Sequence, residues 1–407
     1  MVLLIIRIIN GIIIAMERGA GIPRTLDLPA LLRRKSILLL GPRGTGKSWL
    51  IRERLGDSAL RVDLLRSDRY LRLSADPGEL EAMIDASGRE LVVIDEVQKI
   101  PALLDEAHRL IEERGLRFLL TGSSARKLKR SQANLLAGRA WIANLFPLTW
   151  NELGARFNLE RYLRYGGLPA VYGSEDPAEE LRAYVDTYLK EEIQAEGLVR
   201  RLPAFHRFLK VAALDNGRML NYAHVAADAG VPAASVREHY SILADTLTGF
   251  MLEPWRESKK RKAIQTPKFY FFDTGVAHAL AQTETLDRNS DLYGRSFEQW
   301  LGLELRARLS YARSPAPLTY WRSVHAHEVD FVIGERAAVE VKASRRATDR
   351  DAAGLSVLAE ERVIKSFYLV SQDPVHRRRK VGAAEVEFIP YQLFLRRLWN
   401  GELPGVP

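Results

Sequence analysis

The sequence predicts an α/β protein whose amino-terminal part is a doubly wound parallel sheet. From Ser36 to about Pro147, short apolar runs alternate with stretches of helical periodicity. A glycine-rich motif directly follows the first of these runs, and a later run ends in two adjacent acids. This alternation favours parallel strands joined by crossover helices. The expected strands cover residues 36–40, 59–64, 91–94, 116–121 and 140–145, and the pattern then turns helical from Thr149 to about Gly197.

The glycine-rich motif GPRGTGKS fits the phosphate-binding pattern G-x-x-x-x-G-K-[ST]. Its glycines let the backbone approach phosphate groups closely, so that N–H groups point at them. Lys47 is expected to reach the β- and γ-phosphates and Ser48 to ligate Mg²⁺, and the helix that starts there turns its positive end toward the anion. We therefore expect ATP to be bound by Gly41, Pro42, Arg43, Gly44, Thr45, Gly46, Lys47 and Ser48.

The apolar run at residues 91–94 ends in Asp95 and Glu96, which is the form of a Walker B element. Asp95 is expected to hold Mg²⁺, usually through water, and Glu96 to orient and polarise the attacking water. A carboxylate beside the metal ligand is a candidate general base, so the pair favours hydrolysis over nucleotide storage. Glu96 and Lys47 are therefore expected to be catalytic.

Two further residues are candidates for the nucleotide site, each with an open alternative. Ser123 follows the strand at residues 116–121, where a hydroxyl is suited to sensing the γ-phosphate. Equally, it is suited to capping the helix that follows. Arg139 is the best candidate for an arginine finger, and the alternative is an ordinary solvated arginine.

Composition limits the class of protein and its partners. A chain of 407 residues is too long for one ordinary core, so two or three domains are expected. The chain has no cysteine, which excludes disulfides and thiolate metal sites and suits a reducing cytoplasm. Its net charge of +9 suits an anionic partner such as DNA. Self-association into a homo-oligomer is left open.

The amino terminus is strongly apolar, but Arg7, Asn10 and Gly11 interrupt it. The apolar stretch is shorter than the roughly 20 residues that a membrane-spanning helix needs. The residues around Met16 also make a poor signal-peptide cleavage site. No stable membrane association is expected, and translation from Met16 is the leading alternative for this segment.

Residues 202–280 have the pattern of a winged helix-turn-helix. A short helix at 222–229, a turn at 230–232 and a longer helix at 234–247 precede a hairpin of residues 250–255 and 268–272. A basic tip suits phosphate contacts, and the second helix suits a major groove. The alternative is a structural spacer or a protein-contacting module with a solvated tip. The tip carries Arg256, Lys259, Lys260, Arg261 and Lys262.

A second group of polar residues interrupts apolar strands near the carboxyl terminus. Asp330 lies in one expected strand, and Glu340 and Lys342 share one face of the next, because side chains alternate along a strand. Glu298 lies on a preceding amphipathic helix. This is the layout of the PD-(D/E)xK nucleases, in which the acids hold Mg²⁺ and the lysine positions the attacking water. The alternatives are a solvated strand edge, or the nuclease fold without cleavage.

Taken in order, these motifs resemble the bacterial and archaeal AAA-type ATPases, related to the STAND branch of P-loop NTPases, that end in a domain of unknown function. The resemblance implies an ATPase domain, a winged-helix middle and a PD-(D/E)xK-like end. It is carried by GPRGTGKS (41–48), VVIDEVQKIP (92–101), LLTGSSARKL (119–128), LLAGRA (135–140), FPLTWNEL (146–153), YGGLPAVY (165–172), KFYFFDTGVA (268–277), GRSFEQWL (294–301), EVDFVI (328–333) and VEVKAS (339–344).

The expected organisation has five parts: an amino-terminal segment (1–25), a P-loop AAA-type ATPase domain (26–150), a helical lid or linker (151–201), a winged-helix domain (202–288) and a nuclease-like α/β domain (289–407). The predicted function is ATP hydrolysis coupled to action on nucleic acid through the last two domains, with Mg²⁺ at both sites. The alternative is a regulatory ATPase switch whose nuclease-like domain is inactive and only binds nucleic acid or protein.

Overall fold

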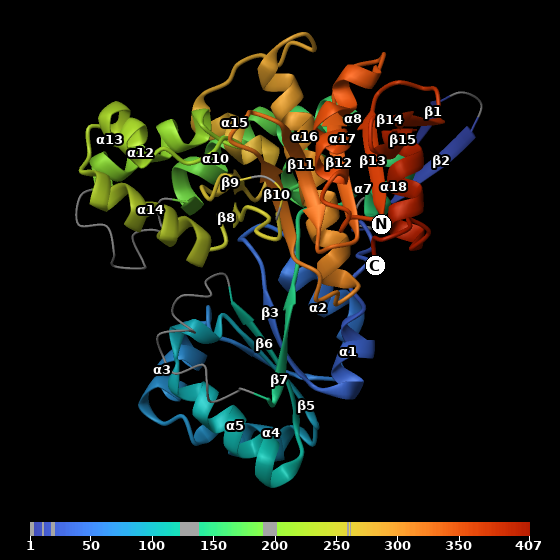
Figure 1. Ribbon diagram of the computed structural model, residues 1–407. Helices are drawn as coiled ribbons and strands as arrows, with labels where there is room; N and C mark the ends of the chain where they lie inside the picture. The colour runs from blue at the N-terminus through green and yellow to red at the C-terminus, as the bar shows by residue number, and fades with distance from the viewer. Residues whose placement is uncertain are drawn as a thin grey trace.

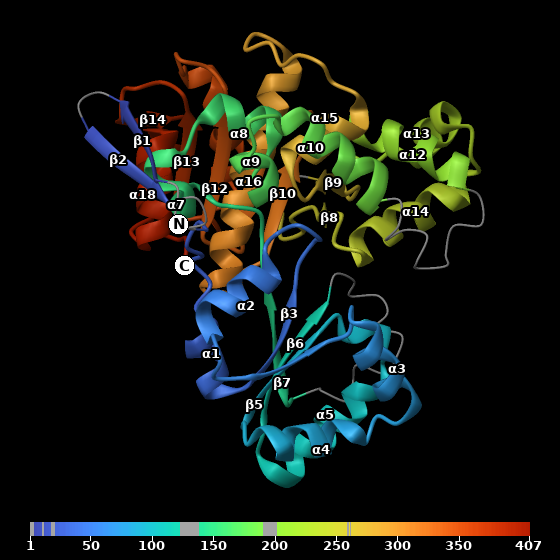
Figure 2. The same ribbon diagram turned by 180° about the vertical axis from the view of Figure 1, so that it is seen from behind.

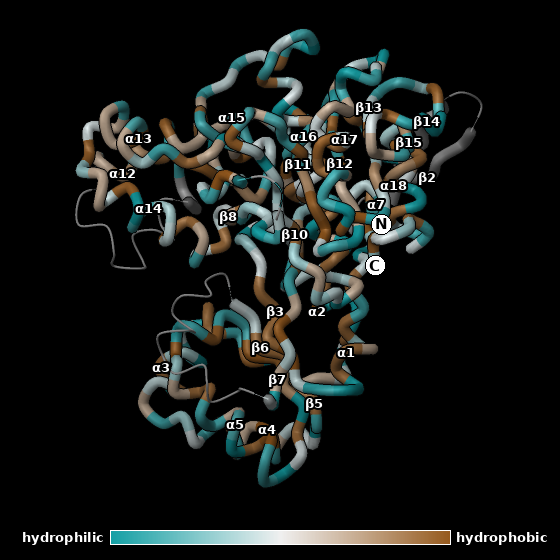
Figure 3. Tube along the Cα trace, viewed as in Figure 1, coloured by the Kyte–Doolittle hydropathy of each residue, from teal (hydrophilic) through white to brown (hydrophobic). Residues whose placement is uncertain are grey.

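The computed structural model describes residues 4–9, 12–17, 21–122, 138–189, 202–258, 260 and 262–407. Figures 1 and 2 show two lobes, one containing α1 to α5 with β3 to β7 and the other containing the remaining labelled helices and strands. In Figure 3 the most hydrophobic segments include the central strands β3 and β6 of the first lobe. The first lobe is therefore organised around a buried sheet.

The first lobe is built on a five-stranded parallel sheet in the order β4–β5–β6–β3–β7. This confirms the parallel sheet that the alternating pattern predicts. Since β6 lies between β3 and β5, the loops that follow β3 and β5 face each other across the end of β6. The strands are β3 (Ser36–Leu40), β4 (Leu60–Asp63), β5 (Leu91–Asp95), β6 (Arg117–Gly122) and β7 (Ala140–Asn144).

Helices cover both faces of this sheet. Ile37 and Leu39 of β3 are buried on the face with α1 and α2, whereas Leu38 and Leu40 are buried on the face with α3, α4 and α5. A parallel strand covered on both faces is apolar on both, which explains the uninterrupted apolar run. The helices are α1 (Leu28–Arg34), α2 (Lys47–Leu55), α3 (Ser67–Ala75), α4 (Glu79–Ser87) and α5 (Ala102–Arg114), with a 3-10 turn η1 (Val97–Lys99) after β5.

Short helices follow β7, as the sequence predicts. Leu153 and Tyr162 from this segment are buried in the core of the carboxyl-terminal region, whereas Leu168 and Leu181 are buried in the core of the middle region. The segment is therefore shared between the two cores beyond it. Its elements are α7 (Trp150–Leu153), η3 (Gly154–Arg156), α8 (Leu159–Tyr165), α9 (Pro169–Gly173), α10 (Pro177–Ala183) and a π-helical stretch η4 (Tyr184–Leu189).

The middle region has three helices followed by an antiparallel hairpin. The sequence predicts the second and third helices and the hairpin, but not the first helix. Asn221 caps α13 by accepting the His224 N–H at 3.1 Å, and Gly230 ends the helix in a left-handed conformation (φ 62°). The elements are α12 (Leu202–Leu214), α13 (Tyr222–Ala229), α14 (Ala233–Asp245), β8 (Gly249–Leu252), β9 (Lys268–Phe271) and α15 (Thr274–Ala281).

The segment between β8 and β9 runs along the carboxyl-terminal sheet. The Trp255 N–H donates to the Tyr320 carbonyl at 2.7 Å, and the Ile264 N–H donates to the Arg322 carbonyl at 2.8 Å. Glu361 also accepts the Lys260 N–H at 3.0 Å. The backbone of the predicted wing is therefore hydrogen-bonded to the carboxyl-terminal region of the same chain. Lys259 and Arg261 lie outside the described residues.

The carboxyl-terminal region is built on a six-stranded mixed sheet in the order β10–β11–β12–β13–β15–β14. β11 and β12 are antiparallel neighbours, as the strand assignments for Asp330 and Glu340 require, and β12, β13 and β15 run parallel. The strands are β10 (Leu318–Arg322), β11 (Glu328–Ile333), β12 (Ala337–Lys342), β13 (Ser366–Ser371), β14 (Arg377–Val381) and β15 (Ala384–Pro390). The other elements are α16 (Asp291–Tyr311), η5 (Asp349–Ala352), α17 (Ala353–Ala359) and α18 (Tyr391–Asn400).

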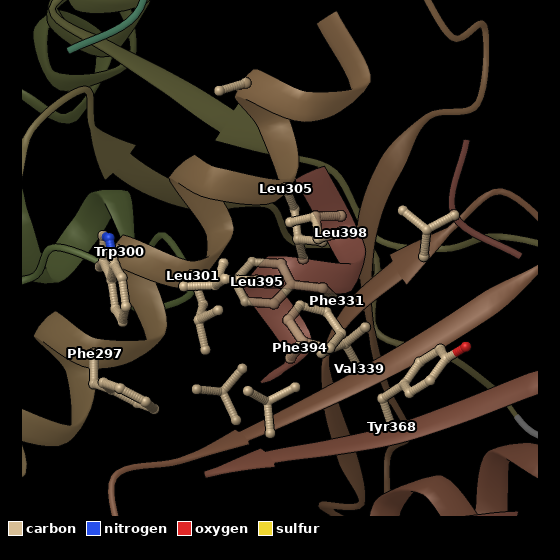
Figure 4. Packing of buried hydrophobic residues seen from close by; sticks show 14 of the residues in the cluster. Phe297, Trp300, Leu301, Leu305, Phe331, Val339, Tyr368, Phe394, Leu395 and Leu398 are labelled. Carbon is tan, nitrogen blue, oxygen red and sulfur yellow. The ribbon is translucent and has the colours of Figure 1, made fainter. Parts of the chain in front are cut away.

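The long helix α16 is the central element of this core. Figure 4 shows its side chains, among them Leu301 and Leu305, lying with Leu398 of α18 and Phe331 of β11. Gly302 is needed at this contact because a Cβ there would lie 2.6 Å from the Phe331 ring. The opposite face of the sheet is covered by α17. The helix thereby fixes the position of Glu298 relative to the strands.

The amino-terminal segment forms a hairpin. β1 (Leu4–Ile9) and β2 (Ile12–Glu17) pair as antiparallel strands, which the sequence did not predict. Across the part of the chain that the structure describes, no helix combines the length and the apolar character needed to cross a bilayer.

Candidate functional site

The phosphate-binding motif forms the loop between β3 and α2, as the pattern predicts. Gly44 (φ 81°) and Gly46 (φ 92°) have left-handed backbone conformations that favour glycine. A Cβ on Gly41 would lie 2.6 Å from the Leu145 carbonyl oxygen. These glycines therefore allow the chain to turn tightly between the end of β3 and the first turn of α2, which begins at Lys47.

Lys47 is folded over this loop. Its Nζ donates to the Gly41 carbonyl at 2.7 Å and to the Pro42 carbonyl at 3.2 Å. The residue is buried, with 7% of its surface exposed. The ammonium group is thus held above the loop, in the region where the phosphate chain is expected.

The second half of the nucleotide site lies at the ends of β5 and β6. The Ser48 hydroxyl donates to Asp95 Oδ2 at 3.0 Å, and the Thr121 hydroxyl donates to Asp95 Oδ1. A hydroxyl and a carboxylate are oxygen ligands that suit Mg²⁺ beside a phosphate chain. Three segments that are distant in sequence therefore bring compatible donor oxygens to one place.

Glu96 has a left-handed backbone conformation (φ 60°), which is uncommon for a residue with a side chain. Its N–H donates to the Thr121 hydroxyl at 3.1 Å, and its carboxylate accepts a hydrogen bond from the Gln98 amide. Thr121 opens the run TGSS, at the strand end where hydroxyls are expected beside the phosphates. In the structure this hydroxyl positions both acids.

Residues outside the motif also hold the loop. Arg24 Nη1 donates to the Thr45 carbonyl at 2.6 Å, and its Nε lies 3.1 Å from Glu152 in a buried ion pair. The Tyr184 hydroxyl donates to the Arg43 carbonyl at 3.1 Å. Sequence reasoning missed Arg24 and Tyr184, because neither belongs to a recognisable pattern and only the tertiary fold brings them to the loop.

One predicted nucleotide-site residue is not brought to the phosphate loop. Arg139 immediately precedes β7, whose first residue pairs with the first residue of β3, so it lies at the opposite end of the sheet from the loop. Its Nε lies 2.6 Å from Glu112 Oε1. The structure therefore does not place Arg139 beside the phosphate loop of its own chain. Ser123 lies outside the described residues.

In the carboxyl-terminal region, Asp330, Glu340 and Lys342 come together as the strand pattern predicts. Asp330 Oδ2 accepts the Val341 N–H at 2.8 Å, and Lys342 Nζ lies 2.6 Å from Glu340 Oε1. Asp330 and Glu340 are both buried. Glu340 Oε2 is buried as well and has no hydrogen-bond partner among the described residues. A buried carboxylate oxygen without a partner is a position where a cation would be stabilised.

The protonation of these groups follows from burial and mutual charge. Burial raises the pKa of Asp330 well above its usual range, and the neighbouring Glu340 charge raises it further. Burial also raises the pKa of Glu340, to about 7, although Lys342 opposes the shift. For Lys342, burial lowers the pKa but the charges of Asp330 and Glu340 outweigh it, so the pKa is raised overall. The two acids therefore resist ionising together without added positive charge.

Glu298 faces the same region but is bound by residues of β9. Lys268 Nζ lies 3.1 Å from Glu298 Oε1 and 2.7 Å from Glu328 Oε1, and the Tyr270 hydroxyl donates to Glu298 Oε1 at 2.5 Å. Sequence reasoning missed Lys268 and Tyr270. Their spacing could have identified them, because residues two apart on a strand share a face and so can contact the same group.

The acid site offers a small number of ligands to a metal ion. Within the described ranges, no group of three or more His, Cys, Asp or Glu residues is arranged to hold one. Glu298 is engaged by Lys268, which leaves Asp330 and Glu340 as the pair of acids beside Lys342. Carboxylate oxygens are hard ligands, so the chemistry of this pair fits Mg²⁺ or Mn²⁺.

Comparisons with known proteins agree with the fold of the first lobe. Residues 33–154 match the family described as an AAA domain. Residues 156–287 and 293–393 match two further families, each described as a domain of unknown function (DUF8612 and DUF4143). The first lobe is therefore an AAA-type ATPase fold, and the family descriptions leave the activity of the other regions unstated.

The chain is similar to several curated proteins and solved structures. Uncharacterised proteins of Mycobacterium bovis and Mycobacterium tuberculosis are each 32% identical over 316 residues, which is 75% of this chain and 68% of theirs. An uncharacterised protein of Haemophilus influenzae is 20% identical over 278 residues, covering 60% of this chain and 69% of its own. The Walker-type ATPase Paby2304 of Pyrococcus abyssi has a TM-score of 0.44 and 16% identity, covering 62% of this chain and 93% of that one.

Proposed function

This chain belongs to the same protein family as the two uncharacterised mycobacterial proteins, and we propose that it binds and hydrolyses ATP at its phosphate loop. The observation that carries the proposal is the meeting of Ser48, Asp95 and Thr121 at the strand ends beside Lys47. The AAA domain matched by residues 33–154 supports the same activity.

Each residue has a chemical role in this proposal. Lys47 transfers its hydrogen bonds from the loop carbonyls to the β- and γ-phosphates of ATP, and Ser48 and Asp95 would hold Mg²⁺. When bound, Mg²⁺ neutralises part of the phosphate charge. Glu96 orients the attacking water and accepts its proton, once the carboxylate is released from Gln98.

Replacing Lys47 by alanine tests the binding half of the proposal. The Lys47→Ala variant should lose most of its affinity for ATP, because a charged contact to two phosphates is removed. Isothermal titration with a non-hydrolysable ATP analogue measures this directly. Lys365→Ala, which removes an exposed lysine from the other lobe, is the matched control and should bind as the wild type does. Equal affinity in both variants would contradict the proposal.

A second candidate function belongs to the carboxyl-terminal region: Mg²⁺-dependent action on nucleic acid by a PD-(D/E)xK-like site. The unpartnered, buried Glu340 Oε2 beside Asp330 and Lys342 favours it, because a module that only binds a partner has no need of an unsatisfied buried carboxylate. Asp330 and Glu340 would hold the metal ion, and Lys342 would position the attacking water. The alternative remains a regulatory ATPase whose nuclease-like region only binds nucleic acid or protein.

Asp330→Ala separates these two functions. It should abolish Mn²⁺-dependent cleavage of single- and double-stranded DNA and RNA, while ATP hydrolysis stays at the wild-type rate because the ATPase site lies in the other lobe. Cleavage on gels and phosphate release should be measured on the same preparation. Cleavage that persists in Asp330→Ala would exclude this site, and absence of cleavage in the wild type as well would favour the regulatory alternative.

A further inference from the structure

A cavity of about 820 Å³ lies beside the acid site, between the first half of α16 and the residues that follow β12. Its charged lining is mostly basic: five cationic residues face two acids, Asp291 and Glu298. We propose that this cavity seats the phosphodiester backbone of a nucleic-acid strand and leads it to Lys342. The proposal deepens the second candidate function and rests on it. The cationic residues are Arg218, Arg288, Arg295, Lys342 and Arg345.

Arg295 is the group most clearly prepared for an anion. It lies on α16 one turn before Glu298, so the two side chains share a face of the helix. Its Nη1 donates to the Leu214 carbonyl at 3.1 Å, but its Nε is buried and has no hydrogen-bond partner among the described residues. A buried N–H without an acceptor costs free energy, and a phosphate oxygen would satisfy both this donor and the positive charge.

The other arginines come from separate parts of the chain. Arg218 follows α12 in the middle region, Arg288 precedes α16, and Arg345 follows β12. Arg218 and Arg288 have half-exposed side chains in ion pairs with Asp215 (3.4 Å) and Glu160 (2.8 Å). Such exposed pairs are weak, so a phosphate can compete for these guanidinium groups. Arg345 is exposed and forms no ion pair with any described residue.

The backbone of α16 adds to this potential. Ser290, Asp291 and Tyr293 of its first turn line the cavity, so the positive end of a 21-residue helix faces the same space as the guanidinium groups. A negatively charged occupant is therefore favoured by the helix terminus, by the arginines and by the Arg295 N–H that has no acceptor.

The lining selects phosphate rather than base. Tyr293 is its single aromatic residue, and this ring is buried, with 1% of the residue exposed. The Tyr293 hydroxyl donates to Glu160 at 2.9 Å and accepts from the Gln372 amide at 3.1 Å. Among the described residues of the cavity, no aromatic face is thus presented for stacking a base, although strand-binding proteins that hold bases use such faces. Recognition through the backbone should therefore be independent of sequence.

Fluorescence anisotropy with the full chain tests the proposal. A fluorescein-labelled 20-nucleotide strand and the matching duplex should be titrated in EDTA, so that neither metal binding nor cleavage enters. Arg218→Ala, Arg295→Ala and Arg345→Ala combined should weaken binding at least 10-fold. They should also lower the log–log salt slope by about 0.7–0.9 for every phosphate that an arginine no longer neutralises.

The matched control removes the same net charge from exposed arginines of the other lobe, as Arg52→Ala, Arg61→Ala and Arg89→Ala combined. It should stay within about 2-fold of the wild type, because charges farther than a Debye length are screened. Inorganic phosphate and AMP at millimolar concentration should not displace the strand, which distinguishes a backbone site from a free-phosphate site.

Arg295 is partly buried, so replacing it could disturb folding. The single variant Arg345→Glu changes an exposed residue and avoids this problem, and it should weaken binding at least 3-fold. Equal effects of the two triple variants, no binding by the wild type, or displacement by phosphate would each overturn the proposal. ATP hydrolysis and Mn²⁺-dependent cleavage are measured on the same samples. If the wild type binds the strand but lacks ATP hydrolysis or cleavage, that result counts against the corresponding proposed function and not against strand binding.

Discussion

Thr121 shows how single residues join parts of the nucleotide site. Its hydroxyl donates to Asp95 and accepts the Glu96 N–H, so one side chain fixes both the expected metal ligand and the expected base. The P-loop and acidic pair were predictable because short-range patterns encode them. The contacts of Arg24 and Tyr184 were not, because they depend on where segments far apart in sequence meet.

Glu304 is a buried carboxylate with a structural role in the carboxyl-terminal core. It accepts hydrogen bonds from the Trp150 N–H at 2.7 Å, the Trp300 indole at 3.2 Å and the Trp399 indole at 2.8 Å. Burial raises its pKa to about 8, although these hydrogen bonds oppose the shift. It therefore ties α7, α16 and α18 together while its ionised form is disfavoured.

This raised pKa gives a pH-dependent prediction. Between the ordinary pKa of 4.5 and the folded-state pKa of about 8, the folded chain holds the proton more tightly than the unfolded chain. Glu304 therefore makes the free energy of unfolding fall as pH rises through this window, by at most about 1.4 kcal/mol per pH unit. Glu304→Gln should remove this contribution.

Urea unfolding followed by circular dichroism at pH 5, 6.5 and 8 measures the effect. The wild type should lose stability relative to Glu304→Gln as pH rises, whereas Glu335→Gln, which changes an exposed carboxylate, should follow the wild type. Parallel pH profiles for the wild type and Glu304→Gln would show that the Glu304 carboxylate does not titrate in this range.

At the scale of elements, β9 connects the middle region to the acid site. Lys268 is almost fully buried, and its ammonium lies between Glu298 and Glu328. Burial lowers its pKa, but the charge of Glu298 and its neighbours outweighs burial and the pKa is raised overall. A strand of the middle region thus supplies a fixed positive charge to the carboxyl-terminal acids.

Removing that charge should make the acid site bind metal more tightly. In Lys268→Met, Glu298 and Glu328 lose their shared cation, so the melting temperature should fall without metal and rise more with Mn²⁺ than in the wild type. Lys268→Arg, which keeps the charge, is the matched control. Thermal unfolding of the full chain with increasing Mn²⁺ gives the comparison. Identical Mn²⁺ responses in all three proteins would show that Lys268 does not compete with a cation.

The elements also show where sequence patterns succeed and fail. The pattern placed α13 at residues 222–229, where the structure has it, because a capping asparagine and a terminal glycine mark both ends. The hairpin after α14 was predicted as a wing with a basic tip. In the structure, Trp255 and Ile264 of this segment bond to β10, a contact between distant segments that no local pattern encodes.

At the scale of the whole molecule, the regions share their cores. The segment after β7 contributes Tyr162 to the carboxyl-terminal core and Leu168 to the middle core. Leu168 and Tyr184 also lie close to Gly44 of the phosphate loop. The order of the ATPase, helical and mixed-sheet regions was predictable from motifs, but this interlocking was not, because it depends on burial between distant segments.

The most direct test of the ATPase assignment is ATP turnover and ATP binding measured together in Glu96→Gln. This variant should bind ATP with nearly wild-type affinity, because Lys47, Ser48 and Asp95 are unchanged. Its turnover should fall by about 10²- to 10⁴-fold, since the general base is removed. Turnover at the wild-type rate in the purified variant would contradict the account.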